Sequence, residues 1–227
     1  EISECLVGSE MCIRDRQYMF LQKNDFILFQ GDSITDCSRN KLNRNDLGEG
    51  YVNLIHHFLT KEYPDLQVSC MNKGIYGNRT IDLKLRWRFD CLRLEPTVLS
   101  LLAGINDTWR RYDFNLMTSE ERFRDHYRYL IESSLERMPD LRIILMSPFL
   151  LPHKEEQVLW FEDLNPKIDI VRSLAAEYNT LYIPLQEIFN ASLTPEHDAH
   201  YFTIDGVHPT PEGHMLIAKE WIKRSLE

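Results

Sequence analysis

Short apolar runs alternate with longer amphipathic segments from about residue 24 onward. The runs suited to buried strands are 26–30, 67–71, 97–102, 141–147 and 181–185. Between and after them, apolar residues recur at helical spacing over 50–63, 80–92, 118–138, 164–178 and 211–225. Parallel strands need crossover helices, so this order predicts a parallel sheet with helices on both faces. The predicted fold class is α/β, three-layer α/β/α with a five-stranded parallel sheet.

Local signals mark several element boundaries. Tyr63-Pro64 is expected to end the helix at 50–63. Thr118 and Glu121 have capping-box spacing, which predicts that the helix begins beside Thr118. Thr210 suits the cap of the last helix, with a proline at the first helical position. The polar segment 40–48 and the proline-containing segment 148–163 are expected to be loops.

Composition narrows the class of protein. A length of 227 residues fits one domain, which we place at 19–227. The formal net charge of −9 argues against nucleic acid or an anionic membrane surface as a partner, because phosphate binding needs a basic face. No apolar run approaches the ~18–20 residues of a membrane span. Residues 1–18 lack any period and resemble translated adapter or vector sequence. We predict a non-native or disordered leader, the alternative being a native, poorly ordered tail.

The cysteines indicate the compartment. There are five, an odd number, and none has CxxC or Cys/His ligand spacing. Residues 1–18 lack the basic start and apolar core of a signal peptide. Reduced thiols in a cytoplasmic protein are therefore predicted in preference to a secreted disulfide framework. The pair His197 and His200 lacks an HExxH pattern or a third ligand, so no metal and no cofactor are predicted.

Reactive residue types follow the predicted strands. The first is followed by Gly31-Asp32-Ser33, the second by Asn72, Gly74 and Gly77, the third by Gly104, Asn106 and Asp107, and the fifth by Asp205 and His208. The carboxyl ends of parallel strands share one edge of the sheet, where ligands bind. A hydroxyl, an imidazole, a carboxylate and a carboxamide at one edge are the groups that nucleophilic acyl transfer requires.

Each group has a chemical role in that reaction. Ser33 is the candidate nucleophile, and His208 is the base that takes its proton. Asp205 would hold the imidazole tautomer and stabilise the imidazolium. The Ser33 N–H, the Gly77 N–H and the Asn106 side chain would bind the oxyanion. The alternative interpretations are local: Ser33 as a helix cap, Asn106 as a self-satisfied loop residue, and Asp205-Gly206 as a turn pair.

Four motifs occur in order: GDSITD (31–36), NKGIYGN (72–78), GIND (104–107) and DGVHP (205–209). Together they resemble the SGNH, or GDSL-type, hydrolase family over about 24–225. The resemblance implies a flavodoxin-like sheet. It places the nucleophile at Ser33, further oxyanion donors at Gly77 and Asn106, and the Asp–His pair at Asp205 and His208. Further stretches, among them RWRFD (86–90) and GINDTWRRYD (104–113), are similar to intracellular acetylxylan esterases and GDSL-type lipases of that family.

The residues around the motifs predict the surroundings of the substrate. We expect Asp32, Tyr76, Trp109 and Arg110 to border it, with packing beneath the loop as the alternative for the residues after Asn106. Tyr76 stands where relatives often have a small residue, so its ring would reshape the acyl pocket.

The predicted activity is a serine carboxyl-ester hydrolase that removes acetyl groups from xylo-oligosaccharides through an acetyl-serine. Its partner would be a small acetylated saccharide or another small ester, and the resemblance implies an oligomer. Two alternatives stay open. One is a lysophospholipase- or thioesterase-type enzyme with the same site. The other is a non-catalytic carbohydrate-binding relative.

Overall fold

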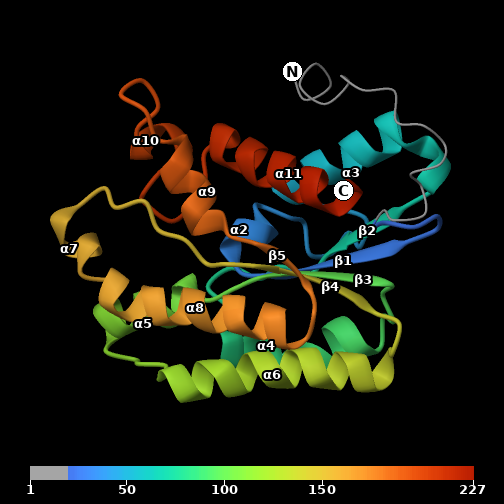
Figure 1. Ribbon diagram of the computed structural model, residues 1–227, viewed down its shortest axis with the longest axis horizontal. Coiled ribbons are helices and arrows are strands. Elements are labelled where there is room, and N and C mark those ends of the chain that lie inside the picture. Colours follow the sequence, from blue (N-terminus) through green and yellow to red (C-terminus); the bar gives the residue numbers. More distant parts are fainter. Residues whose placement is uncertain (1–19) are drawn as a thin grey trace.

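The computed structural model describes residues 20–227. Its strands are β1 (Phe26–Gly31), β2 (Ser69–Asn72), β3 (Val98–Leu102), β4 (Arg142–Met146) and β5 (Leu181–Ile183). They form one parallel sheet in the order β2-β1-β3-β4-β5 (Figure 1). The predicted α/β class and the five-stranded parallel sheet are therefore confirmed. The predicted leader, 1–18, lies outside the described residues.

Helices cover both faces of the sheet. On one face lie α3 (Tyr51–Glu62) and α11 (Pro211–Leu226), which pack against each other. On the other face lie α4 (Thr80–Trp87), α6 (Glu120–Arg137) and α8 (Phe161–Glu177), with α6 between its two neighbours (Figure 1). As predicted, Thr210 caps α11, its side chain accepting a hydrogen bond from the Gly213 N–H.

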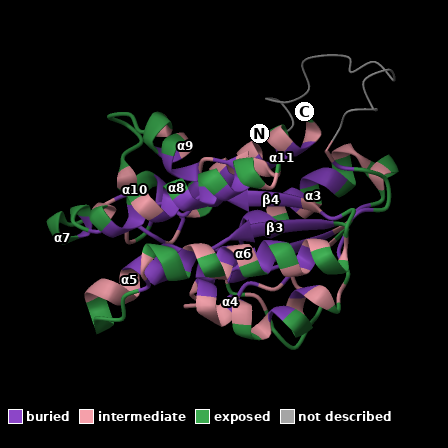
Figure 2. Ribbon diagram, turned by 60° about the horizontal axis from the view of Figure 1, so that its bottom comes forward, coloured by how far each residue is buried: buried purple, intermediate pink, exposed green. Residues whose placement is uncertain are grey.

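Alternation along the strands explains why two apolar cores form. In β1, Ile27 and Phe29 point into the core under α3 and α11, while Leu28 points into the core under α4, α6 and α8. Successive side chains of a strand face opposite sides of a sheet, so a strand covered on both faces must be largely apolar. Figure 2 shows this arrangement: the central strands are buried, and the helices expose only their outer faces.

Two predicted boundaries move in the structure. The cap of α6 is Ser119, whose side chain accepts a hydrogen bond from the Arg122 N–H. The predicted cap, Thr118, is instead buried and hydrogen-bonds the carboxylate of Asp107. The helix predicted over 80–92 is α4 followed by a π-helical turn, Arg88–Leu92.

Several short helices lie where loops or strand ends were expected. They are α2 (Ser33–Asp36), α5 (Ile105–Phe114), α7 (Glu155–Val158), α9 (Leu185–Ser192) and α10 (Ala199–Phe202), and Pro64–Leu66 forms a 3₁₀ turn. Helix α5 was missed because it buries the polar residues Asn106, Asp107 and Thr108 beside Ile105, and only Trp109 and Tyr112 continue its apolar face. The fifth strand ends at Ile183, two residues before its predicted end, because Pro184 caps α9.

No helix among residues 20–227 is both long and apolar enough to cross a membrane.

Candidate active site

The predicted reactive residues all follow the carboxyl ends of strands. Ser33 begins α2 directly after β1, and Gly77 lies in the turn between β2 and α4. Asn106 is in the first turn of α5 after β3, so it is held by a helix and not by the expected loop. Asp205 and His208 occupy a turn that precedes α11. This turn is closed by an antiparallel bridge between Thr203 and Pro209.

Ser33, His208 and Asp205 form one chain of hydrogen bonds. Ser33 Oγ lies 3.0 Å from His208 Nε2, and His208 Nδ1 lies 2.7 Å from Asp205 Oδ2. The other oxygen of Asp205 accepts the N–H groups of Val207 and His208 at 2.9 and 2.8 Å. An ionised carboxylate only accepts, so Nδ1 carries the imidazole proton and Nε2 presents its lone pair to Ser33. The turn thus fixes the tautomer that a general base requires.

Two opposite pKa shifts accompany this geometry. Partial burial raises the pKa of Asp205, but the hydrogen bonds from the His208 ring and from two backbone N–H groups outweigh it and lower the pKa to about 2. The hydrogen bond that His208 donates to Asp205 raises the pKa of His208, against the opposing effect of burial. The pair therefore favours an imidazolium beside a carboxylate, the charge state that develops when serine loses its proton.

Helix α2 presents Ser33 to the histidine. Asp32 is its N-cap and accepts the Ile34 N–H at 3.0 Å, so Ser33 is the first helical residue and not the cap. An N–H at that position has no acceptor within the helix and can bind another group. Asp32 is fully buried, and burial raises its pKa to about 7. Its position favours capping over the contact with substrate predicted for it.

One hydrogen bond links the other two candidate oxyanion donors, Asn106 and the turn that carries Gly77. Asn106 donates one amide hydrogen to the Asn78 carbonyl at 3.2 Å, next in sequence to Gly77, and keeps its second hydrogen for another acceptor. Gly77 has a φ of +74°, in the left-handed region that favours glycine. The side chain of Asn106 also lowers the pKa of Asp32, the residue that precedes Ser33, so the two side chains lie close together. Asn106 is thus linked both to the segment that carries Gly77 and to the residue before Ser33, and the shared oxyanion role of the three donors stays a prediction.

Buried polar contacts that the sequence did not reveal hold these segments together. Asp107 accepts the Thr80 N–H at 2.9 Å and the Thr80 hydroxyl at 2.8 Å, which ties the start of α5 to the start of α4. Arg86 donates to the Asn78 side chain at 2.8 Å and to the Gly31 carbonyl at 3.3 Å, which ties the Gly77 turn to the end of β1. Only the position of Asp107 inside the GIND motif hinted at such a role.

Aromatic rings border the histidine. Tyr76, 68% exposed, lies parallel to the His208 ring with centroids 6.0 Å apart. Trp109 lies 5.8 Å from the same ring and packs against Trp160, which sequence reasoning missed. The guanidinium of Arg110 lies over the Trp109 ring at 5.9 Å. Tyr76 and Trp109 are thus close to the candidate base, as their substrate-binding roles would require, and Arg110 lies next to Trp109.

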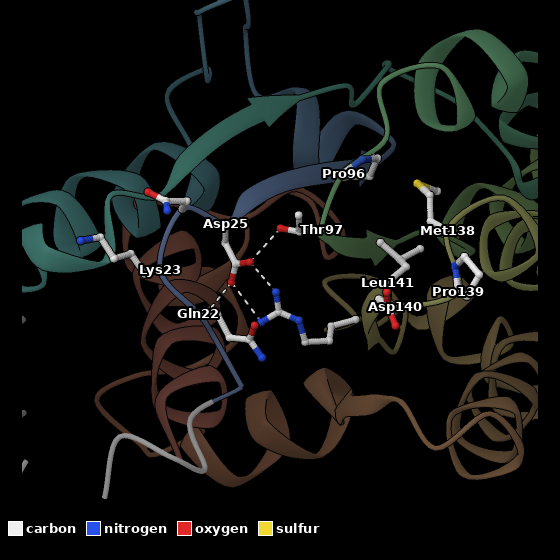
Figure 3. A pocket seen from close by; sticks show the side chains of 11 residues that line it. Gln22, Lys23, Asp25, Pro96, Thr97, Met138, Pro139, Asp140 and Leu141 are labelled. Atoms are coloured by element: carbon white, nitrogen blue, oxygen red, sulfur yellow. Dashed lines mark hydrogen bonds and ion pairs between the residues drawn. The ribbon is translucent and has the colours of Figure 1, made fainter. Parts of the chain in front are cut away.

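Other candidate sites lie away from this edge or lack the necessary groups. Within residues 20–227, no group of three or more His, Cys, Asp or Glu side chains is placed to hold a metal ion. A cavity of about 700 Å³ opens at the amino ends of β1, β3 and β4 (Figure 3). Its lining includes Asp25 and Thr97 but none of the predicted site residues.

Comparison with known proteins identifies the family. Residues 29–216 match the model of the GDSL-like lipase/acylhydrolase family. The chain belongs to this family. An acetylxylan esterase from Geobacillus stearothermophilus is 35% identical over 211 residues, which cover 90% of this chain and 95% of that protein. The family and this relative support carboxylic ester hydrolase activity, and the predicted resemblance is confirmed.

Solved structures agree with this assignment. A protein from Parabacteroides merdae that is assigned as a GDSL-like lipase superposes on the present chain with a TM-score of 0.86 and 34% identity, over 90% of this chain and 97% of that one. The Geobacillus stearothermophilus acetylxylan esterase superposes with a TM-score of 0.81 and 32% identity, over 91% and 96% of the two chains. Its forms described as catalytic mutants replace a serine, an aspartate or a histidine by alanine.

Proposed function

We propose that the esterase removes acetyl groups from xylo-oligosaccharides through an acetyl-serine intermediate. The observation that carries the proposal is the hydrogen-bonded chain from Ser33 through His208 to Asp205, with its 3.0 and 2.7 Å contacts. A serine hydroxyl becomes an effective nucleophile only beside a base of this kind.

The proposed reaction uses the groups where they lie. Ser33 Oγ attacks the acetyl carbonyl carbon while His208 Nε2 takes the hydroxyl proton. The backbone N–H groups of Ser33 and Gly77 and the Asn106 amide bind the oxygen that becomes negative. His208 then gives its proton to the departing sugar oxygen. Water, activated by the same histidine, releases acetate from Ser33.

The sugar as leaving group is the more specific part of the proposal. The acetylxylan esterase from Geobacillus stearothermophilus supports it, since this chain covers 95% of that relative. The rings of Tyr76 and Trp109, both near His208, support it too, because aromatic faces pack well against sugar rings.

Acetate release from acetylated xylo-oligosaccharides tests the proposal. We expect Ser33→Ala to lower kcat by at least ~10³-fold, because the nucleophile is gone. Ser133→Ala is the matched control, since the Ser133 hydroxyl donates to the Tyr129 carbonyl of its own helix, away from the proposed site. A Ser33→Ala enzyme that keeps a tenth of wild-type turnover would refute the mechanism.

Two further assays separate the alternatives. A deacetylase should lose activity steeply along a series of p-nitrophenyl acetate, butyrate and octanoate, whereas a lysophospholipase-type enzyme should gain activity. A non-catalytic carbohydrate-binding relative would bind xylo-oligosaccharides but would not be labelled at Ser33 by a serine-reactive phosphonate.

We also propose a cytoplasmic location. The three cysteines among the described residues, Cys37, Cys70 and Cys91, are free thiols, as a reducing compartment would keep them. A Bacillus subtilis lipoprotein, 32% identical over 123 residues, covers only 54% of this chain and 47% of its own length. Fractionation of the source cells, with an antibody to this chain, distinguishes a cytoplasmic location from the membrane attachment of a lipoprotein.

We also propose that the esterase is a homo-oligomer. Analytical ultracentrifugation tests this proposal.

A further inference from the structure

One buried polar side chain stands out in the segment that joins β4 to α8. Gln157 in α7 is 8% exposed, whereas the helix residues on both sides of it, Glu156 and Val158, are exposed. A buried carboxamide is costly unless its hydrogen bonds are satisfied. The contacts of Gln157 therefore show what the segment holds in place.

The two ends of the Gln157 amide bind different parts of the chain. Its Nε2 donates to the backbone carbonyl of Asp205 at 2.7 Å. Its Oε1 accepts the N–H groups of His153 and Lys154 at 2.8 and 3.3 Å. Only this orientation matches donors with acceptors at both ends, so the position of the amide is fixed.

The turn that carries Asp205 and His208 lies directly against this amide. Gly206 has a φ of +94°, and a Cβ there would lie 3.0 Å from both Gln157 amide atoms and 2.8 Å from the Leu151 carbonyl oxygen. The Leu151 N–H also donates to the Gly206 carbonyl at 2.8 Å. The turn needs glycine at position 206 because a side chain there would collide with Leu151 and Gln157.

We propose that Gln157 is a positioning residue for the Asp205–His208 pair. It acts through the backbone of Asp205, whose carboxylate in turn fixes the tautomer of His208. Without the amide, the turn loses one of its backbone anchors and the 2.7 Å contact between Asp205 Oδ2 and His208 Nδ1 loosens. The inference rests on the proposed catalytic role of this pair.

Gln186 provides a matched control. It is also a buried glutamine, on α9, and its amide makes the same kind of bridge to this segment. Its Oε1 accepts the Leu150 N–H at 2.9 Å, and its Nε2 donates to the Leu150 carbonyl at 3.1 Å. It does not contact the Asp205 turn through either bond. Replacing it removes a comparable anchor without touching the proposed catalytic pair.

The test compares Gln157→Met with Gln186→Met, using kcat per active site titrated with a serine-reactive phosphonate. We expect Gln157→Met to lower kcat about 10- to 100-fold with little change in KM, because small misplacements of a base are costly. The rising limb of its pH profile should move to lower pH, since the hydrogen bond that His208 donates to Asp205 is what raises the pKa of His208. Gln186→Met should leave that limb in place.

Gln157→Glu gives a second readout. It keeps the acceptor for the His153 and Lys154 N–H groups but loses the N–H donor to the Asp205 carbonyl, so kcat should again fall about 10- to 100-fold. This variant also tests the inference if Gln157→Met does not fold. A wild-type kcat in a folded Gln157 variant, a wild-type limb in Gln157→Met, or the same changes in Gln186→Met overturns the inference. Turnover by Ser33→Ala would instead overturn the proposed function itself.

Discussion

At the scale of single residues, two carboxylates near Ser33 respond oppositely to their surroundings. Asp205 receives hydrogen bonds from the His208 ring and from two backbone N–H groups, and its pKa falls to about 2. Asp32 is fully buried, one of its oxygens has no hydrogen-bond partner among the described residues, and its pKa rises to about 7. Hydrogen bonding to the charged form and loss of water shift a pKa in opposite directions. Only Asp205 is therefore suited to stabilise an imidazolium.

The pH dependence of the esterase follows from this pair. His208 must be neutral to act as a base, and its raised pKa places the rising limb of kcat/KM above the ordinary histidine value of about 6.5. We expect Asp205→Asn to move the limb to lower pH, because the interaction that raises the pKa is lost, and to lower kcat roughly 10³–10⁴-fold. A pH–rate profile from pH 5 to 9 checks both effects. An unshifted limb would contradict this account of the pair.

The Asn106 amide is the second single-residue prediction. Asn106→Ala removes the one side-chain donor proposed for the oxyanion, and we expect kcat to fall on the order of 10²–10³-fold with a small change in KM. The mutant also loses the contact with the Asn78 carbonyl, so thermal unfolding must be measured with the kinetics. A loss of kcat below threefold would remove Asn106 from the oxyanion hole.

At the scale of elements, the four-residue helix α2 depends entirely on its neighbours. A helix this short is unstable alone. Its Thr35 hydroxyl lies 3.0 Å from the Tyr51 hydroxyl on α3, and the Thr35 carbonyl accepts from Asn72 at the end of β2. The nucleophile is thus held by contacts from two other elements and by the cap at Asp32.

The cap gives a prediction about stability. In the unfolded chain Asp32 loses its proton near pH 3.9, but in the folded chain near pH 7, so wild-type stability decreases as pH rises through that window. Asn caps helices as well as Asp and does not titrate. We expect the free energy of unfolding of Asp32→Asn, relative to wild type, to increase from pH 5 to pH 8. Urea unfolding at both pH values measures it, and a constant difference would contradict the raised pKa.

At the scale of the whole molecule, the sheet separates the site from a buried ion pair at its other end. Asp25 precedes β1 and pairs with Arg142 at the start of β4, while Ser33 and Asn106 follow the carboxyl ends of their strands. Asp25 also accepts hydrogen bonds from the Gln22 N–H and the Thr97 hydroxyl, at 2.6 and 2.8 Å (Figure 3). A substitution at the ion pair should therefore change the free energy of unfolding without changing catalysis at the other end of the sheet.

Arg142→Met tests this separation. It leaves the buried carboxylate of Asp25 without its cation, so we expect the free energy of unfolding to fall by about 3 kcal/mol. We expect kcat and KM, measured well below the unfolding temperature, to match the wild type. Urea unfolding and steady-state kinetics on the same preparation check both parts. A changed kcat in a folded variant would show that the two ends are coupled.

The sequence alone determined the order of the five strands and of the longer helices that cover the sheet, and the residues proposed to react. Both follow from local patterns: apolar periodicity predicts each element, and GDSITD, GIND and DGVHP place Ser33, Asn106 and the Asp205–His208 pair after strands. Because the carboxyl ends of parallel strands lie at one edge of the sheet, the sequence also predicted that these residues lie close together.

Only the tertiary structure decided how they are held. The buried polar face of α5, the link from Asp107 to Thr80 and the anchoring of the Asp205 turn by Gln157 join segments 27 to 48 residues apart in sequence. A buried glutamine in a four-residue helix has no periodic signal, because its position is set by the backbone carbonyl that it meets in space. Hydrogen bonds between distant segments form only once the sheet has assembled, so no local pattern could predict them.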